Sequence, residues 1–253
     1  IKGLTKVSKQ TRIVVMTEGI LIRMIQSNPS LSEVGCIIFD EFHERSINSD
    51  LGLALSLQIA EILRSDLRII VMSATLDVGS VSDLLDTKAP IISDGRAYPV
   101  NCEYLSRPRS KNDKLWENFA KLVCDAFEMT EGGILAFLPG EAEIRATEKL
   151  LKEKLPNSAI IMPLYGSLPF EQQNKILEPL KDETFRKVVL STSIAETSLT
   201  ISGIKVVVDS GYTRRSRYDP TSGMSGLITQ KISKAEANQR MGRAGRVAAG
   251  WCY

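Results

Sequence analysis

Two adjacent carboxylates, Asp40 and Glu41, are the first residues of the chain whose types and spacing suggest chemistry. They follow the apolar residues 36–39 (Cys-Ile-Ile-Phe), which predict a buried strand. Functional groups of parallel sheets gather at the carboxyl ends of the strands. One carboxylate there can hold Mg²⁺, directly or through water, while its neighbour accepts a proton from an attacking water. A strand with a solvated acidic end is the plainer interpretation of the pair alone, but His43, the only histidine, follows within three residues and favours a functional contact.

The segment Ser-Ala-Thr at residues 73–75 follows the next strand-like run. Taken alone, small hydroxyl residues after a strand are typical of a helix cap. At the end of a strand adjacent to residues 36–39, however, Ser73 and Thr75 can hydrogen-bond the carboxylate pair. That position suits them to couple the state of a bound nucleotide to motion.

Three arginines recur at intervals of three in the segment Gln-Arg-Met-Gly-Arg-Ala-Gly-Arg, residues 239–246. If the segment is helical, Arg240, Arg243 and Arg246 share one face. Guanidinium groups gathered on one surface repel one another unless an anion lies there, and a triphosphate is a suitable anion for bidentate arginine contacts. The alternative is a basic helix that binds RNA or an acidic partner.

Hydroxyl-rich segments follow other predicted strands. Residues 191–200 (Ser-Thr-Ser-Ile-Ala-Glu-Thr-Ser-Leu-Thr) combine hydroxyls with the backbone N–H groups of a helix start, which suits phosphodiester oxygens. Alone, this segment also fits a capped loop. Residues 17–19 (Thr-Glu-Gly) and 165–167 (Tyr-Gly-Ser) equally fit plain turns or caps.

The elements that must position these residues alternate between strand and helix patterns. We expect strands at residues 12–16, 36–39 and 68–72 and helices at 18–26 and 50–63 in a first part, residues 1–97. Residues 98–113 contain two prolines, several charges and no sustained period, which indicates a linker. The alternation then restarts in residues 114–253, with helices at 115–127, 141–154 and 170–180 and strands at 134–137, 160–162, 187–190 and 205–208. Two such patterns predict an α/β protein with two parallel-sheet lobes.

One stretch of the second part breaks the alternation. Residues 212–218 and 227–232 are both strand-like, and Asp-Pro-Thr-Ser-Gly at 219–223 has the residue types of a turn. The pattern predicts an antiparallel hairpin with Arg214, Arg215 and Arg217 on one arm.

Bulk composition restricts the class of protein. The net charge of +2 says little about nucleic acid, so local clusters must carry that inference. No apolar run approaches the roughly 18 residues of a membrane helix, so no membrane partner is expected. The four cysteines form no CxxC pair, which argues against a zinc site or a disulfide framework and suits a reducing cytoplasm. The sequence starts at Ile1 and has no G-x-x-x-x-G-K-[ST] phosphate loop, so we expect an internal piece that begins after that loop.

Together, these motifs resemble those of the DEAH/RHA-type DExH-box helicases of superfamily 2. Residues 40–45 resemble motif II, 73–75 motif III, 191–200 motif V and 239–246 motif VI; residues 17–19 and 135–140 are similar to motifs Ib and IV. Phe42 stands where many members have alanine. With residues 92–100, it makes the chain most similar to the bacterial HrpB-type helicases.

The resemblance implies two RecA-like lobes, the first incomplete, with ATP and Mg²⁺ in the cleft and single-stranded RNA across both lobes. It implies that Asp40 serves Mg²⁺, that Glu41 orients or deprotonates the attacking water, and that Gln239 lies near the γ-phosphate. Arg243 and Arg246 would be the arginine fingers, His43, Ser73 and Thr75 would also line the nucleotide site, and the hairpin would separate strands. The implied nucleic-acid contacts are Thr17, Glu18, Gly19, Gly140, Ser167, Thr192 and Ser193. Without motif I and its lysine, the piece alone is expected to be inactive.

Two further hypotheses stay open at this point: a nucleic-acid-binding module that no longer hydrolyses nucleotide, and a DNA translocase with the same engine. The helicase hypothesis is favoured by Glu41, Gln239, Arg243 and Arg246. A module that only binds nucleic acid needs neither a carboxylate that activates water nor an arginine finger. No residue that would contact the RNA 2′-hydroxyl can be identified from the sequence, so DNA remains an alternative to RNA. The sequence carries no signal for an oligomeric state.

Overall fold

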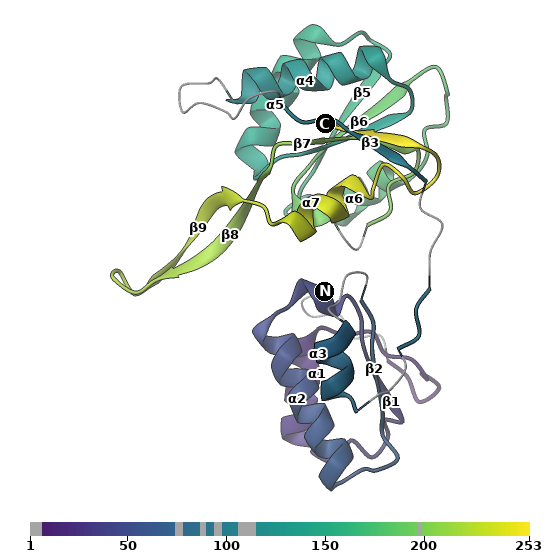
Figure 1. Ribbon diagram of the computed structural model, residues 1–253, viewed down its shortest axis with the longest axis vertical. Helices are drawn as coiled ribbons and strands as arrows, with labels where there is room; N and C mark the ends of the chain where they lie inside the picture. Colours follow the sequence, from purple (N-terminus) through teal and green to yellow (C-terminus); the bar gives the residue numbers. More distant parts are fainter. Residues whose placement is uncertain (1–6, 74–77, 87–89, 94–97, 106–114, 197–198) are drawn as a thin grey trace. The chain divides into compact units, whose positions relative to one another are not determined.

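The structure is a computed structural model that describes residues 7–73, 78–86, 90–93, 98–105, 115–196 and 199–253. Contacts between residues divide the chain into two units, Ile1–Ser93 and Asp94–Tyr253. Figure 1 shows both units, and each is described by itself.

The first unit is built around two parallel strands, β1 (Cys36–Phe39) and β2 (Arg68–Val71), paired in register from Cys36 opposite Arg68 to Phe39 opposite Val71. Its helices are α1 (Glu18–Ser27), α2 (Ile47–Ile62) and α3 (Val78–Leu84), and a short 3-10 helix, η1 (Phe42–Glu44), follows β1. The Phe39 ring packs closely on α2, because a Cβ at Gly52 would lie only 3.4 Å from it. This close packing holds the end of β1 against the helix.

The strand predicted at residues 12–16 is wrong. The segment has no regular secondary structure, and Ile13 and Val15 are 85% and 94% exposed. A β-branched run becomes a strand only when a neighbour supplies the ladder hydrogen bonds, and no strand within the described ranges pairs with it. The strands predicted at residues 36–39 and 68–72 are confirmed, and the second of them ends one residue earlier than predicted, at Val71.

The second unit has a six-stranded sheet in the order β3-β10-β7-β4-β6-β5, with every neighbouring pair parallel. The strands are β3 (Val100–Cys102), β4 (Gly133–Phe137), β5 (Ala159–Leu164), β6 (Arg186–Ser191), β7 (Ile204–Asp209) and β10 (Gly250–Cys252). Helices α4 (Leu115–Met129) and α5 (Glu141–Lys154) cover one face, and α6 (Phe170–Leu177) and α7 (Lys234–Met241) lie on the other (Figure 1). The central strand β4 is buried along its whole length, as its continuous apolar sequence predicts. The expected α/β class is therefore confirmed.

Part of the expected linker belongs to this sheet. Val100–Cys102 forms the edge strand β3 and pairs with β10. Three residues without a period carry little local signal, and the partner strand lies near the other end of the sequence. The contact boundary accordingly falls between Ser93 and Asp94, before the residues 98–113 that we expected to link the lobes.

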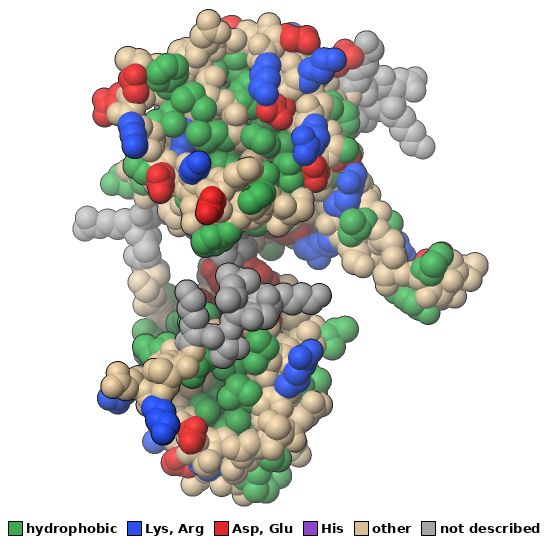
Figure 2. All heavy atoms as spheres, turned by 180° about the vertical axis from the view of Figure 1, so that it is seen from behind, with side chains coloured by type: hydrophobic (Ala, Val, Ile, Leu, Met, Phe, Trp, Pro, Cys, Tyr) green, Lys and Arg blue, Asp and Glu red, His purple; other side chains and the backbone are tan. Residues whose placement is uncertain are grey.

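The predicted hairpin is confirmed as an antiparallel pair, β8 (Tyr212–Asp219) and β9 (Met224–Lys231), which projects from the second unit (Figure 1). Its turn is closed by Asp219, whose carboxylate accepts hydrogen bonds from the Thr221 N–H and the Ser222 hydroxyl. The exposed hydrophobic side chains of the hairpin are Tyr218, Met224 and Leu227. Figure 2 shows hydrophobic side chains toward its far end.

The base of the hairpin is held by two ion pairs. The Arg214 guanidinium lies 2.8 Å from Glu143 in the first turn of α5. Arg215 pairs with Glu236 in the first turn of α7. Two of the three arginines expected on this arm therefore anchor it to helices of its own unit.

Across the described segments, no helix is both long enough and apolar enough to cross a bilayer.

Candidate functional site

The carboxylates of the first unit lie in a tight turn at the end of β1. Asp40 is exposed, and its Oδ1 accepts a hydrogen bond of 2.9 Å from the Glu41 N–H. Glu41 has φ 51° and ψ 37°, a left-handed conformation that is uncommon outside glycine and concentrates at functional sites. The turn is fixed from the β2 side, because the Phe42 N–H donates to the Met72 carbonyl over 3.0 Å. The buried ring of Phe42 also packs against the Phe39 ring in an edge-to-face arrangement.

His43 connects Glu41 to the end of the neighbouring strand. Its side chain is only 7% exposed, and its Nε2 lies 3.4 Å from Glu41 Oε2. Its Nδ1 lies 3.2 Å from the Ser73 hydroxyl. The structure therefore brings together three of the predicted nucleotide-site residues, with His43 between the carboxylate and Ser73. Thr75 lies outside the described residues.

Arg45, the last residue of the acidic motif, has a structural role. Its guanidinium pairs with both carboxylate oxygens of Asp50, at 3.0 and 2.9 Å, and lies 5.4 Å from the centre of the Phe42 ring. The Asp50 carboxylate raises the pKa of Arg45 by hydrogen bonding and charge. The pair ties the turn to the first turn of α2.

The donors at this turn suit Mg²⁺ bound together with a nucleotide. No group of three histidine, cysteine or acidic side chains positioned for a metal occurs in the described part of the chain. Mg²⁺ in phosphate sites takes one or two protein carboxylates and completes its coordination with phosphate and water. The exposed Asp40 carboxylate and the half-exposed Glu41 carboxylate fit that requirement.

The predicted nucleic-acid residues of the first unit begin α1. Thr17 is the N-cap residue, is exposed and makes no capping hydrogen bond with its side chain. Gly19 is half-buried in the first turn. Glu18 is exposed beside them, and its negative charge suits the helix dipole but would repel a phosphate.

The predicted nucleic-acid residues of the second unit follow β4, β5 and β6, which are adjacent in the sheet, so they lie along one edge. Thr192 is the N-cap of the 3-10 helix η2 (Ser193–Ala195) and makes no side-chain capping bond, and Ser193 is exposed. Ser167 is exposed and donates to Glu141 over 3.3 Å. Gly140 is buried instead, because a Cβ there would lie 2.6 Å from the Arg214 guanidinium.

Residues 239–246 do not form one continuous helix, so the condition under which the three arginines would share a helical face is not met. Helix α7 starts at a capping box between Ser233 and Glu236 and ends at Met241, before Gly242. Gln239 is half-buried on this helix, while Arg243 and Arg246 lie in the turns that follow it. Glycine has a low helix propensity, and the two glycines of this segment disfavour a continuation of the helix.

Arg240 is fully buried and belongs to an internal charge network. Its Nε lies 3.1 Å from Glu196, and its Nη1 lies 2.9 Å from Asp209 and 3.2 Å from the Tyr212 carbonyl. The guanidinium also stacks on the Phe137 ring at 4.8 Å. Burial raises the pKa of Glu196, and the charge of Arg240 opposes that rise. The network ties α7 to the segment after β6, to the end of β7 and to the start of β8. The sequence analysis missed its two acidic members, Glu196 and Asp209.

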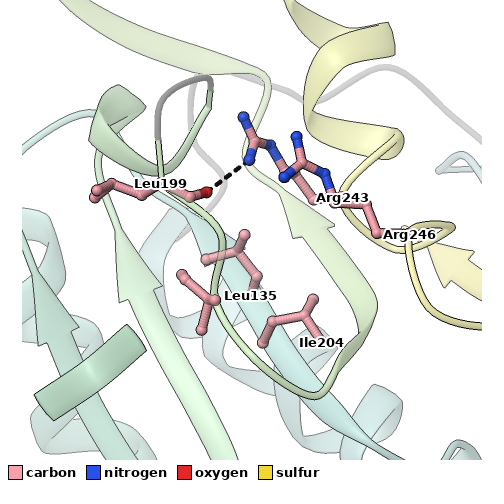
Figure 3. A pocket seen from close by; sticks show the side chains of 6 residues that line it. Leu135, Leu199, Ile204, Arg243 and Arg246 are labelled. Atoms are coloured by element: carbon pink, nitrogen blue, oxygen red, sulfur yellow. Dashed lines mark hydrogen bonds between the residues drawn. The ribbon is translucent and has the colours of Figure 1, made fainter. Parts of the chain in front are cut away.

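Arg243 and Arg246 line a small pocket with Leu135, Leu199, Ile201 and Ile204 (Figure 3). Arg243 is 6% exposed and donates to the carbonyls of Glu196 and Leu199. Arg246 is exposed and donates to the Thr200 hydroxyl over 2.8 Å. Their side chains run side by side from one loop (Figure 3). Arg246 is thus the more accessible of the two cations.

Comparisons with known proteins show the family of the chain. A family model described as "Helicase conserved C-terminal domain" matches residues 110–248, and one described as "DEAD/DEAH box helicase" matches residues 2–84. The chain belongs to the DEAD/DEAH-box helicase family. This helicase chain is 44% identical to the ATP-dependent RNA helicase HrpB of Escherichia coli over 96% of its length and 30% of HrpB. It is 39% identical to the human ATP-dependent RNA helicase DHX33, over 97% of the chain and 36% of DHX33.

Solved structures give the same result. A crystal structure of the E. coli DEAH/RHA helicase HrpB matches 97% of this helicase chain and 31% of the HrpB chain, with a TM-score of 0.88 and 44% identity. The RecA-like helicase fold and the resemblance to HrpB-type helicases are therefore confirmed. The chain spans less than two fifths of the length of these relatives.

Proposed function

We propose that this chain is the motor portion of an ATP-dependent RNA helicase, in which ATP hydrolysis drives translocation along single-stranded RNA and separation of strands. The observation that carries the proposal is the geometry of Glu41. The residue is held in a left-handed turn at a strand end, half-exposed, and connected through His43 to Ser73. A purely structural acidic turn needs neither the unusual backbone nor the buried histidine.

In the first unit, Asp40 would hold Mg²⁺ directly or through water; the ion neutralises phosphate charge when it is bound with ATP. Glu41 orients the attacking water and accepts its proton. His43 contacts the Glu41 carboxylate and limits the orientations that it can take. Ser73, which contacts the other ring nitrogen of His43, links this group to the end of β2.

In the second unit, Arg246 is the proposed principal arginine finger, because its guanidinium is exposed. Arg243 is the proposed second cation and also braces the loop after β6 through the carbonyls of Glu196 and Leu199. Gln239, half-buried on α7, would lie near the γ-phosphate. These cations would stabilise the charge of the transferred phosphoryl group.

The RNA contacts proposed here are backbone contacts. Thr192, Ser193 and Ser167 offer hydroxyls along one edge of the six-stranded sheet, and Thr17 offers a hydroxyl at the start of α1. Hydroxyls and helix N-termini contact phosphates without reading sequence. We also propose the division into lobes at residues 1–97 and 114–253, the strand-separating role of the hairpin, and a cytoplasmic location. ATP hydrolysis that is stimulated by single-stranded DNA and not by RNA would support the DNA translocase instead.

The test substitutes Glu41→Gln in the full-length protein. The change preserves size but removes the proton acceptor, so RNA-stimulated ATP hydrolysis should fall by about 100-fold or more, while ATP binding is retained. Glu61→Gln, an exposed residue of α2, makes the same change of charge away from the turn and should keep the wild-type rate. An unchanged rate in Glu41→Gln would remove this residue from the mechanism. A wild-type protein that binds RNA and never hydrolyses ATP would support the binding-module hypothesis instead.

A further inference from the structure

Two of the four cysteines face each other across the edge of the six-stranded sheet. Cys102 on β3 and Cys252 on β10 are direct register partners in a parallel pair. Residues in register on adjacent parallel strands project to the same face, and neighbouring strands lie about 4.8 Å apart. That spacing falls within the roughly 4.4–6.8 Å between Cα atoms that a disulfide requires.

A third sulfur lies beside this pair. The Cys102 thiol donates to Met241 Sδ over 3.0 Å. Met241 is the last residue of α7, two positions before Arg243. Cys102 is exposed, whereas Cys252 is partly buried. Burial and the neighbouring Cys102 thiol raise the pKa of Cys252 to about 12, so the Cys252 thiol stays protonated near neutral pH.

We propose that Cys102 and Cys252 are a reversible oxidation site, which closes to a disulfide in reaction with a small disulfide such as oxidised glutathione and thereby loosens the end of α7. Closure draws the Cys102 sulfur toward Cys252 and away from Met241. The end of α7, which precedes Arg243 and Arg246, then loses one of its contacts with the sheet.

The reaction balances as two thiol–disulfide exchanges. The Cys102 thiolate attacks one sulfur of the small disulfide, whose S–S bond breaks; the released thiolate takes up the proton that Cys102 lost. The Cys252 thiolate then attacks the Cys102 sulfur and releases the second small thiol. Two protein thiols are oxidised, and one small disulfide is reduced to two thiols. The exposed Cys102 is the sulfur that a dissolved disulfide reaches first, and the high pKa of Cys252 makes the second exchange the slower one.

The residues that lead into β3, the strand of Cys102, are also pressed directly against the motif VI segment. The Tyr98 N–H donates to the Gly245 carbonyl over 2.9 Å, and a Cβ at Gly245 would lie only 2.5 Å from the Tyr98 carbonyl oxygen. The Gly250 N–H donates to the Pro99 carbonyl over 3.0 Å. Because this side of the segment has no spare space, a shift of β3 is transmitted to residues 242–249.

Cys36 supplies a matched control within the same chain. It is exposed like Cys102, but it lies on β1 of the other unit, opposite Arg68 in the strand register. It can therefore form a mixed disulfide with a small thiol but has no cysteine opposite it to complete an intramolecular bond.

The experiment incubates the chain with oxidised glutathione and maps its disulfides by peptide mass spectrometry. We expect a peptide cross-linked between Cys102 and Cys252 in the wild type and in Cys36→Ser. In Cys252→Ser, Cys102 should instead stop at the glutathione adduct, and dithiothreitol should reverse both products. A wild-type Cys102 that also stops at the adduct, or that stays a free thiol, would overturn the proposal.

The second readout is hydrogen–deuterium exchange of peptides covering residues 234–249. We expect a loss of protection in the oxidised wild type and in oxidised Cys36→Ser, and recovery after reduction. A disulfide that forms without any change in exchange would refute the effect on α7. Neither readout depends on ATP hydrolysis, so the result is independent of the proposed helicase function.

Discussion

Replacement of Arg240 by alanine should strongly destabilise the second unit, although arginine is usually a surface residue. The side chain is fully buried and meets Glu196, Asp209 and the Tyr212 carbonyl, with the Phe137 ring beneath it. Alanine would leave two nearly buried carboxylates without their shared cation. Removal of one partner from a buried ion pair costs about 3–5 kcal/mol, and we expect a loss in that range.

The assay is urea unfolding followed by tryptophan fluorescence. Both tryptophans, Trp116 and Trp251, belong to the second unit, so the signal reports that unit. Arg215→Ala is the control, because it removes an ion pair to Glu236 whose arginine is 57% exposed. Exposed pairs contribute about 0–1 kcal/mol, so the control should stay close to wild type.

The pH dependence of this loss gives a second check. The folded-state pKa of Glu196 is raised above its ordinary value of 4.5, so the stability linked to this group is present below pH 4.5 and is lost as pH rises through the folded pKa. Arg240 lowers the pKa of Glu196, so its removal makes the folded-state pKa of Glu196 rise further. Arg240→Ala should therefore cost less near pH 4.5 than at pH 8. A loss below about 1 kcal/mol at pH 8, or one that does not change with pH, would refute the buried network.

Three further predictions concern the finger, the RNA loop and the core. In the full-length protein, Arg246→Ala should lower ATP turnover by roughly 10³-fold with and without RNA; a turnover within a few-fold of wild type would remove it as the finger. Thr192→Ala should weaken RNA stimulation in an ATPase titration and preserve the basal rate; equal loss of both would contradict a backbone contact. Arg186→Met should lower the free energy of unfolding of the second unit by about 3 kcal/mol in the urea assay, because the half-buried guanidinium binds the carbonyl of Phe127 in α4 and those of Thr130 and Gly132 just after the helix. A loss as small as that of Arg215→Ala would show that water replaces those bonds.

Local sequence patterns were sufficient to predict a helix or strand wherever residues close in sequence decide the conformation. The helix at residues 141–154 is confirmed with its predicted bounds, because its apolar residues have helical spacing and Gly140 precedes its first turn. The strand at 36–39 is also confirmed, and its apolar run ends at the carboxylates. Ser73 meets the acidic turn through His43 because β1 and β2 are parallel neighbours, and their carboxyl ends therefore coincide.

Tertiary structure decided what depends on segments that are distant in sequence. Residues 12–16 have the composition of a strand, but no described strand pairs with them. Val100–Cys102 has no strand pattern in its sequence, and it forms a strand because β10 pairs with it. Arg240 and Arg243 belong to the same series of arginines at intervals of three residues. In the structure, however, Arg240 neutralises buried carboxylates, whereas Arg243 binds backbone carbonyls. Residue type and spacing thus determined the chemistry available to this chain. Burial and distant partners determined which of those groups are used to hold the fold and which remain accessible, because both depend on the packing of the whole unit.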